Sequence, residues 1–174
     1  MRISFVCSGN ICRSPTAEFV MRALVAEAGA DIEVESAGTG AWHVGADMDR
    51  RSRAELVARG HEIPGHRARQ FEPDDFDRLD LVVAMDASHL EDLQALARTP
   101  DEREKVVLLG DFDPARRDDP SVPDPYYGGL DGFADVLDRV TDGCRGLLTS
   151  LTGRGRCGSG TASASSRTPG GTPD

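Results

Sequence analysis

Short hydrophobic runs alternate along the chain with longer segments in which hydrophobic residues recur every three or four positions. The short runs predict strands, and the longer segments predict amphipathic helices. Strands are expected at residues 2–6, 32–36, 79–85 and 105–109. Helices are expected at residues 16–28, 51–59, 87–98 and 130–151. This alternation predicts an α/β fold, a three-layer sandwich in which a four-stranded parallel sheet carries helices on both faces.

Two segments fall outside this pattern. Residues 110–129 are rich in Asp and Pro and are expected to form a long loop. Residues 153–174 contain Gly, Ser, Thr, Ala and Pro but almost no large hydrophobic residue. Such a segment buries too little surface to offset its loss of conformational entropy. We therefore expect one domain at residues 1–152, followed by a disordered tail at residues 153–174.

Charge and cysteine content restrict the environment and the partners. The net charge of −10 disfavours nucleic acid and anionic membranes as partners. The sequence shows neither a secretory leader pattern nor a hydrophobic run of membrane-spanning length. Cys7, Cys12, Cys144 and Cys157 suggest no disulfide framework and lack the paired spacing of a zinc site. These features predict a cytoplasmic protein, and the predominance of Arg over Lys is typical of a GC-rich bacterium.

The candidate chemistry lies between the first predicted strand and the first predicted helix. Residues 6–15 read Val-Cys-Ser-Gly-Asn-Ile-Cys-Arg-Ser-Pro, so five residues separate Cys7 from Arg13. Gly9 permits a sharp turn, and Asn10 tolerates a left-handed backbone. The N–H groups of such a loop and the N-terminus of the following helix favour an anion at one point. The same groups favour the thiolate form of Cys7, so the segment predicts a phosphate site with its own nucleophile.

Cleavage of a phosphate ester also requires an acid that protonates the leaving oxygen. The best candidate is Asp124, which Pro123 and Pro125 hold in a stiff segment. Tyr126 and Tyr127 follow and offer flat surfaces to an aromatic substrate. The alternative is a solvated acidic loop, because four more aspartates lie nearby: Asp111, Asp113, Asp118 and Asp119.

Six segments together resemble one family, the low-molecular-weight protein tyrosine phosphatases of bacterial type. The matching segments are residues 6–15, 36–39, 42–45, 65–70, 84–90 and 124–128. They occur in the family's order and cover the chain from its start to about residue 150. Each segment alone is a weak signal, but their combination is highly specific.

The resemblance implies a role for each matching residue. Cys7 would accept the phosphoryl group, and Arg13 would bind two of its oxygens through the guanidinium fork. Asp124 would protonate the leaving tyrosyl oxygen and then deprotonate the water that hydrolyses the phosphocysteine. Backbone N–H groups of the loop would complete the phosphate site. These groups belong to Ser8, Gly9, Asn10, Ile11, Cys12 and Ser14.

The resemblance also implies supporting residues and a substrate. Ser14 would stabilise the Cys7 sulfur, while Ser36 and His66 would help Asn10 to hold the loop in shape. Aromatic residues would border the pocket mouth, namely Trp42, Tyr126 and Tyr127. The expected substrates are phosphotyrosine-containing proteins, with a cognate tyrosine kinase, a monomeric enzyme and neither metal nor cofactor. The remaining histidines are expected to be plain surface residues, namely His43, His61 and His89.

Three alternative functions use the same kind of loop. A thioredoxin-coupled arsenate reductase of this fold needs further cysteines near residues 85–93, and none is present there. Protein-arginine phosphatases of the family carry threonine where this chain has Ile11. A phosphopeptide-binding module without activity would have lost Cys7 or Asp124. Cys12 has two interpretations, packing behind the loop or forming a disulfide with Cys7 under oxidation.

Overall fold

The computed structural model describes residues 1–116 and 118–154. The strands are β1 (Arg2–Cys7), β2 (Glu33–Gly38), β3 (Leu81–Ala84) and β4 (Val106–Leu108). The α-helices are α1 (Arg13–Ala28), α2 (Arg50–Ala58), α3 (Asp75–Arg78), α4 (Ala87–Leu96), α5 (Pro100–Glu104) and α6 (Leu130–Arg154). Two short 3-10 helices follow β4, namely η1 (Leu109–Phe112) and η2 (Pro114–Arg116).

The four strands form one parallel sheet in the order β2-β1-β3-β4. At its carboxyl edge, Cys7 pairs with Gly38 of β2, and Val6 pairs with Ala84 of β3. After β1 the chain forms β2 on one side of β1, and it later forms β3 on the other side of β1. In open parallel sheets, ligands bind outside the carboxyl ends of the strands at such a reversal of strand order. The topology therefore directs attention to the loops that follow β1 and β3.

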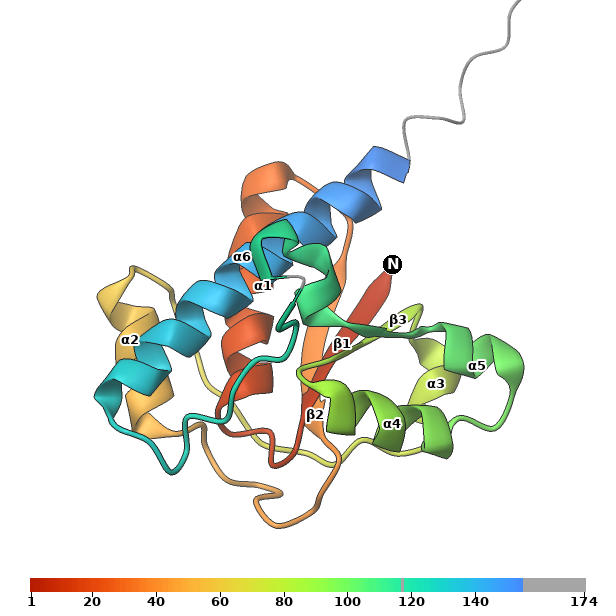
Figure 1. Ribbon diagram of the computed structural model, residues 1–174, viewed down its shortest axis with the longest axis horizontal. Helices are drawn as coiled ribbons and strands as arrows, with labels where there is room; N and C mark the ends of the chain where they lie inside the picture. Colours follow the sequence, from red (N-terminus) through yellow and green to blue (C-terminus); the bar gives the residue numbers. More distant parts are fainter. Residues whose placement is uncertain (117, 155–174) are drawn as a thin grey trace, which may run out of the picture.

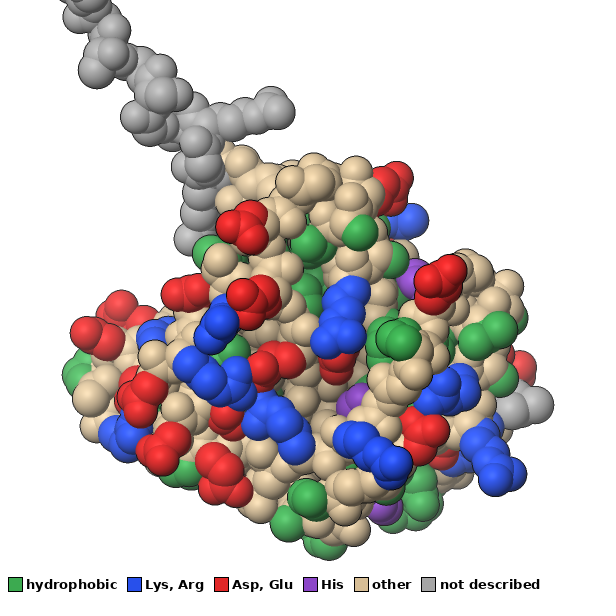
Figure 2. Space-filling view, turned by 180° about the vertical axis from the view of Figure 1, so that it is seen from behind, with side chains coloured by type: hydrophobic (Ala, Val, Ile, Leu, Met, Phe, Trp, Pro, Cys, Tyr) green, Lys and Arg blue, Asp and Glu red, His purple; other side chains and the backbone are tan. Residues whose placement is uncertain are grey.

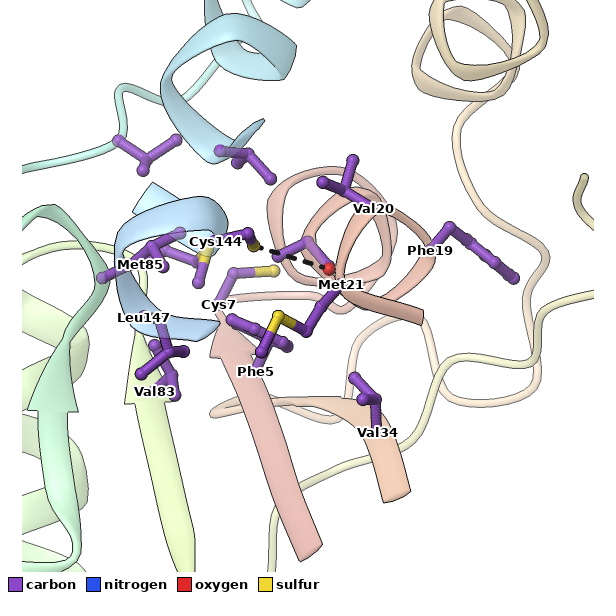
Figure 3. Packing of buried hydrophobic residues seen from close by; sticks show 14 of the residues in the cluster. Phe5, Cys7, Phe19, Val20, Met21, Val34, Val83, Met85, Cys144 and Leu147 are labelled. Carbon is purple, nitrogen blue, oxygen red and sulfur yellow. Dashed lines mark hydrogen bonds between the residues drawn. The ribbon is translucent and has the colours of Figure 1, made fainter. Parts of the chain in front are cut away.

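Alternating side chains of β1 enter the two hydrophobic layers of the molecule. Ile3, Phe5 and Cys7 belong to the layer beneath α1 and α6, whereas Val6 belongs to the layer beneath α4. The two helical layers cover opposite faces of the sheet (Figure 1). Figure 3 shows Phe5 beside Met21 of α1. Because both faces of β1 are buried, the strand is a rigid support for the loop that follows it.

The long helix α6 approaches its neighbours closely at a glycine. A Cβ atom at Gly146 would lie 1.9 Å from the carbonyl oxygen of Phe112 in η1. No side chain fits there, so glycine allows η1 to lie directly against the helix. Nearby, Cys144 is fully buried, and its thiol faces the Ala17 carbonyl of α1 (Figure 3). Burial raises the pKa of the Cys144 thiol above its ordinary value.

The predicted fold class and all four strands are confirmed, but several element boundaries differ. The first helix begins at Arg13 instead of residue 16. The sequence analysis missed α3 and α5, and it assigned the segment containing η1 and η2 to loop. At the end of the domain, α6 continues through residues 153 and 154, which were assigned to the tail. The rest of the predicted tail, residues 155–174, lies outside the described residues.

Ion pairs cover much of the surface. Figure 2 shows Lys and Arg side chains intermingled with acidic side chains on one face. For example, Arg78 of α3 contacts Glu35 of β2 at 2.6 Å and Asp75 at 2.5 Å. Arg78 and Glu35 are partly exposed, whereas Asp75 is buried. Ion pairs that are exposed to solvent each contribute little to stability. None of the helices in the described parts of the chain is long and apolar enough to cross a membrane.

Candidate active site

The loop between β1 and α1 is wound tightly against the end of β2. Asn10 has a φ of 54°, which is the left-handed conformation that its residue type tolerates. Backbone N–H groups of Thr39 and Gly40 donate to the carbonyls of Cys7 and Ser8 at 2.8 and 2.9 Å. A Cβ atom at Gly38 would lie 2.6 Å from the Ser8 carbonyl oxygen. A glycine at the end of β2 is therefore a geometric requirement for the shape of this loop.

Asn10 is fully buried, and hydrogen bonds satisfy its side chain. Its Nδ2 donates to the hydroxyls of Ser14 and Ser36 at 2.9 and 2.8 Å. Its Oδ1 accepts from the backbone N–H of Arg69 at 3.0 Å. The backbone carbonyl of Asn10 accepts from His66 Nε2 at 2.7 Å. The structure thus brings together the three residues expected to support the loop and adds Arg69, whose backbone contact gives no sequence signal.

Ser14 lies directly beside the sulfur of Cys7. The Ser14 hydroxyl is 3.0 Å from Cys7 Sγ and 3.1 Å from the Ala37 carbonyl oxygen. Because Asn10 donates to this hydroxyl, the single Ser14 hydrogen is left for the sulfur or for the Ala37 carbonyl. A thiolate can only accept, so Ser14 can donate to Cys7 when the cysteine is ionised.

Arg13 is 4% exposed, and its guanidinium group reaches three parts of the chain. Its Nη1 donates to Asp86 Oδ2 at 2.7 Å and to the Val122 carbonyl at 3.3 Å. Its Nη2 donates to Ser8 Oγ at 3.3 Å and to Asp124 Oδ2 at 3.1 Å. Arg13 thus connects the loop after β1 with the loop after β3 and with the segment before α6.

The sequence analysis missed the wider role of Asp86 and misplaced His89. Asp86 caps α4, because its Oδ1 accepts from the His89 N–H at 2.9 Å. Burial alone would raise the pKa of Asp86, but hydrogen bonds from His89 and Ser88 hold that pKa far below its usual range. His89 is 2% exposed, so the expectation of a surface histidine is wrong. Both residues lie just after β3, and it is the pairing of β3 with β1 that brings them to the loop.

Asp124 lies at the opening of the pocket. Its Oδ2 contacts Arg13, its Oδ1 accepts from the Tyr126 N–H at 3.0 Å, and its side chain is 46% exposed. In contrast, Asp119 pairs with Arg139 of α6 at 3.0 Å. Of these two neighbouring carboxylates, only Asp124 is placed to meet a substrate at the loop.

The loop, Arg13 and Asp124 surround a pocket of about 510 Å³. The pocket is lined by Cys7, Ser8, Gly9, Ile11, Cys12, Arg13, Trp42, His43, Asp124, Tyr126 and Tyr127. Trp42 is 75% exposed and Tyr127 is 92% exposed, so both stand at the rim. The sequence analysis did not place His43 here, and its ring lies beside Gly9 and Tyr126. Burial and the negative charge of Asp49 raise the pKa of Cys12 to about 12.

This fold and pocket define a class of protein. A parallel α/β sheet carries a cysteine at the carboxyl end of its central β1 strand, beside a buried arginine and a carboxylate at the pocket mouth. The arginine and the helix N-terminus favour an oxyanion, and the thiol supplies a nucleophile. The class is that of thiol-dependent phosphoryl-transfer enzymes.

Comparisons with known proteins give the family. The family model of low molecular weight phosphotyrosine protein phosphatases matches residues 2–156. A low molecular weight protein-tyrosine-phosphatase of Streptomyces coelicolor is 51% identical over 153 residues, 86% of this chain and 93% of the relative. The crystal structure of a protein tyrosine phosphatase from Entamoeba histolytica, with Hepes in its active site, matches with a TM-score of 0.84 and 34% identity, covering 89% of this chain and 99% of that one. The structure of DARP, a drosophila arginine phosphatase, matches with a TM-score of 0.81 and 34% identity, covering 87% and 98%.

The chain belongs to the low molecular weight phosphotyrosine protein phosphatase family. The family resemblance inferred from the sequence is therefore confirmed, and with it the expectation of a phosphatase.

Proposed function

We propose that this protein hydrolyses phosphotyrosine in proteins through a phosphocysteine intermediate on Cys7. One observation carries the proposal. Cys7 and Arg13, from the loop after β1, meet Asp124, from the segment before α6, at one pocket with an aromatic rim. A nucleophile, a guanidinium fork and an acid within one pocket are the groups that this reaction needs.

In the first step, the Cys7 thiolate attacks phosphorus, and the new S–P bond forms as the bond from phosphorus to the tyrosyl oxygen breaks. Asp124 donates its proton to that oxygen, so tyrosine leaves as a neutral phenol. Arg13 binds two oxygens of the transferring group through its guanidinium group, which Asp86 and Ser8 hold in the resting pocket. The charge that develops on the phosphoryl oxygens thus meets donors that are already in place.

In the second step, Asp124, now a carboxylate, takes a proton from a water molecule that attacks phosphorus. The S–P bond breaks, inorganic phosphate forms, and the electron pair returns to Cys7 as a thiolate. Ser14 lies 3.0 Å from the sulfur and donates to it as the thiolate leaves. Asn10 orients Ser14, which explains why the buried polar network extends behind the loop.

The rim and floor of the pocket support an aromatic substrate. Trp42, Tyr126 and Tyr127 form the rim, and the branched hydrocarbon side chain of Ile11 lines the inside. A phenyl ring fits between such surfaces, and the shorter phosphoserine does not extend as far toward the sulfur. Because one structural neighbour is an arginine phosphatase, phosphoarginine is the competing substrate to test.

The experiment compares hydrolysis of matched phosphotyrosyl, phosphoseryl and phosphoarginyl peptides, with Cys7→Ser as the inactive control. We expect the highest kcat/KM for phosphotyrosine. In Ile11→Thr, we expect a smaller ratio of kcat/KM for phosphotyrosine to kcat/KM for phosphoarginine. A wild-type preference for phosphoarginine would overturn the substrate class.

The proposal also covers where and how the enzyme acts. The enzyme is a monomer in the cytoplasm of a bacterium, and its substrates are proteins that a cognate tyrosine kinase phosphorylates. It uses neither metal nor cofactor and binds neither nucleic acid nor membrane. The free thiols of Cys7, Cys12 and Cys144 support a reducing compartment. Catalysis resides in the domain expected at residues 1–152. Full activity of a chain truncated after residue 154, in the presence of a chelator, is the expected result.

A further inference from the structure

Four side chains around the loop form a closed ring of polar contacts. Arg13 Nη1 donates to Asp86 Oδ2 at 2.7 Å, and Asp86 Oδ1 lies 2.9 Å from His89 Nδ1. His89 Nε2 lies 2.8 Å from Ser8 Oγ, which accepts from Arg13 Nη2 at 3.3 Å. The ring therefore begins and ends on the two nitrogens of the guanidinium fork.

The chemistry of the groups sets the direction of the contacts that Arg13 makes. Guanidinium can only donate, so Asp86 Oδ2 and Ser8 Oγ both accept from Arg13. The backbone N–H of His89 donates to Asp86 Oδ1 at 2.9 Å, and the imidazole Nδ1 lies 2.9 Å from the same oxygen. Ser8 Oγ and His89 Nε2 share one hydrogen bond, which joins the imidazole to the second partner of Arg13.

We propose that His89 is a positioning residue that, through Ser8 and Asp86, fixes the plane of the Arg13 guanidinium for oxyanion binding. The proposal rests on the proposed function, in which Arg13 binds the phosphoryl group. His89 itself is buried beneath the loop, and it is not among the residues that line the pocket. It links the two partners that hold Nη1 and Nη2. Without that link, Ser8 Oγ rotates freely, and the fork loses one of its two supports.

The test measures the dissociation constant of inorganic phosphate by calorimetry for Ser8→Ala, His89→Asn and the double variant. In Ser8→Ala, the fork loses its acceptor while the backbone of the loop remains. In His89→Asn, the amide takes the place of Nδ1 beside Asp86, and the backbone N–H at position 89 still donates to Asp86. The shorter side chain does not reach Ser8. His61→Asn is the matched control, because His61 lies outside the pocket and outside the ring.

We expect each single variant to weaken phosphate binding about five-fold, the size of one hydrogen bond, and the double variant to bind about as weakly as the weaker single one. The control is expected to bind phosphate like the wild type. A merely structural loss would lower the fraction of molecules that bind and leave their dissociation constant unchanged. If Ser8→Ala binds phosphate within about two-fold of wild type, or if the two single effects multiply in full, the proposal is overturned.

Two features keep the test decisive. If His89→Asn fails to fold, as a thermal unfolding scan would show, the result for Ser8→Ala alone decides. Measuring the dissociation constant of phosphate does not require turnover. An enzyme that binds phosphate but leaves phosphotyrosine intact would therefore contradict the proposed function and not this inference.

Discussion

At the residue scale, the pocket combines two kinds of side chain. Arg13 and Asn10 are buried, and several hydrogen bonds hold each of them. Asp124 is half exposed and is held by Arg13 and by the Tyr126 N–H. The buried groups are thus fixed before substrate arrives, whereas the acid stands where a leaving group enters and departs.

The position of Asp124 predicts a specific kinetic defect. Asp124→Asn is expected to lose roughly 10²- to 10⁴-fold in kcat on phosphotyrosine, because general acid catalysis of the difficult leaving group is removed. On an ester with an acidic leaving group, such as p-nitrophenyl phosphate, the loss is expected to be much smaller. Asp119→Asn is the control, since Asp119 pairs with Arg139 instead. Equal losses on both esters would contradict the assignment.

The two cysteines of the loop are expected to differ in reactivity. Iodoacetate at neutral pH should modify Cys7, and inorganic phosphate should protect it. Cys12 should remain unmodified, because its pKa of about 12 leaves little thiolate. Peptide mapping after partial inactivation checks this, with Cys7→Ser as the control. Inactivation that tracks modification of Cys12 would be the contrary result.

The sequence predicts the residues of the loop better than their partners. One short segment contains Cys7, Asn10, Arg13 and Ser14. Its turn preferences and its residue types together predict a phosphate-binding loop. His89 gave no such signal. Its partner Ser8 is 81 positions away, and only the pairing of β3 with β1 brings the two together. Contacts of this kind depend on strand order, which the hydrophobic pattern leaves open.

At the element scale, the sheet places the site. β1 ends in the loop, β2 ends at Gly38 beneath it, and β3 leads into Asp86. The sequence predicted all four strands because short hydrophobic runs are clear signals. It missed α3 and α5 because helices of four and five residues are too short for a 3.6-residue period to show.

The close approach of β2 to the loop predicts a sensitive glycine. Gly38→Ala would place Cβ 2.6 Å from the Ser8 carbonyl and 3.0 Å from the Asn10 N–H. Both neighbours are backbone atoms, so the loop must shift. We expect phosphate binding and thermal stability to fall together. Gly132→Ala is the control, because the nearest atom to its Cβ would be 3.8 Å away. Unchanged phosphate affinity in Gly38→Ala would contradict the expected packing.

At the scale of the whole molecule, charge and burial make stability depend on pH. Burial alone would raise the pKa values of Glu35 and Asp75, but hydrogen bonds from Arg69 and Arg78, with the Glu72 N–H at Asp75, lower them. Asp86 has a lowered pKa as well. Burial also raises the pKa values of the Cys12 and Cys144 thiols, and there the net shift is upward. These shifts act at opposite ends of the pH scale.

The direction in which stability changes with pH follows from the difference in proton binding between the folded and unfolded states. Carboxyls with lowered pKa values stabilise the fold above about pH 4, their unfolded range, and this contribution is lost as the pH falls through the folded values. Thiols with raised pKa values stabilise the fold below about pH 8.5, and that contribution declines as the pH rises toward the folded values. Urea unfolding across this range should show a plateau between about pH 5 and 8, with losses on both sides. A free energy of unfolding that rises below about pH 4 would contradict this account.

The central claim is that the phosphoryl group passes through the sulfur of Cys7. The most direct test stops turnover of a phosphotyrosyl peptide within its first cycle and maps the phosphoryl group on the protein by mass spectrometry. We expect an S-phosphocysteine at Cys7, formed in the wild type and absent in Cys7→Ser, which should also be inactive. A phosphoryl group on another residue, or hydrolysis that persists in Cys7→Ser, would contradict the mechanism.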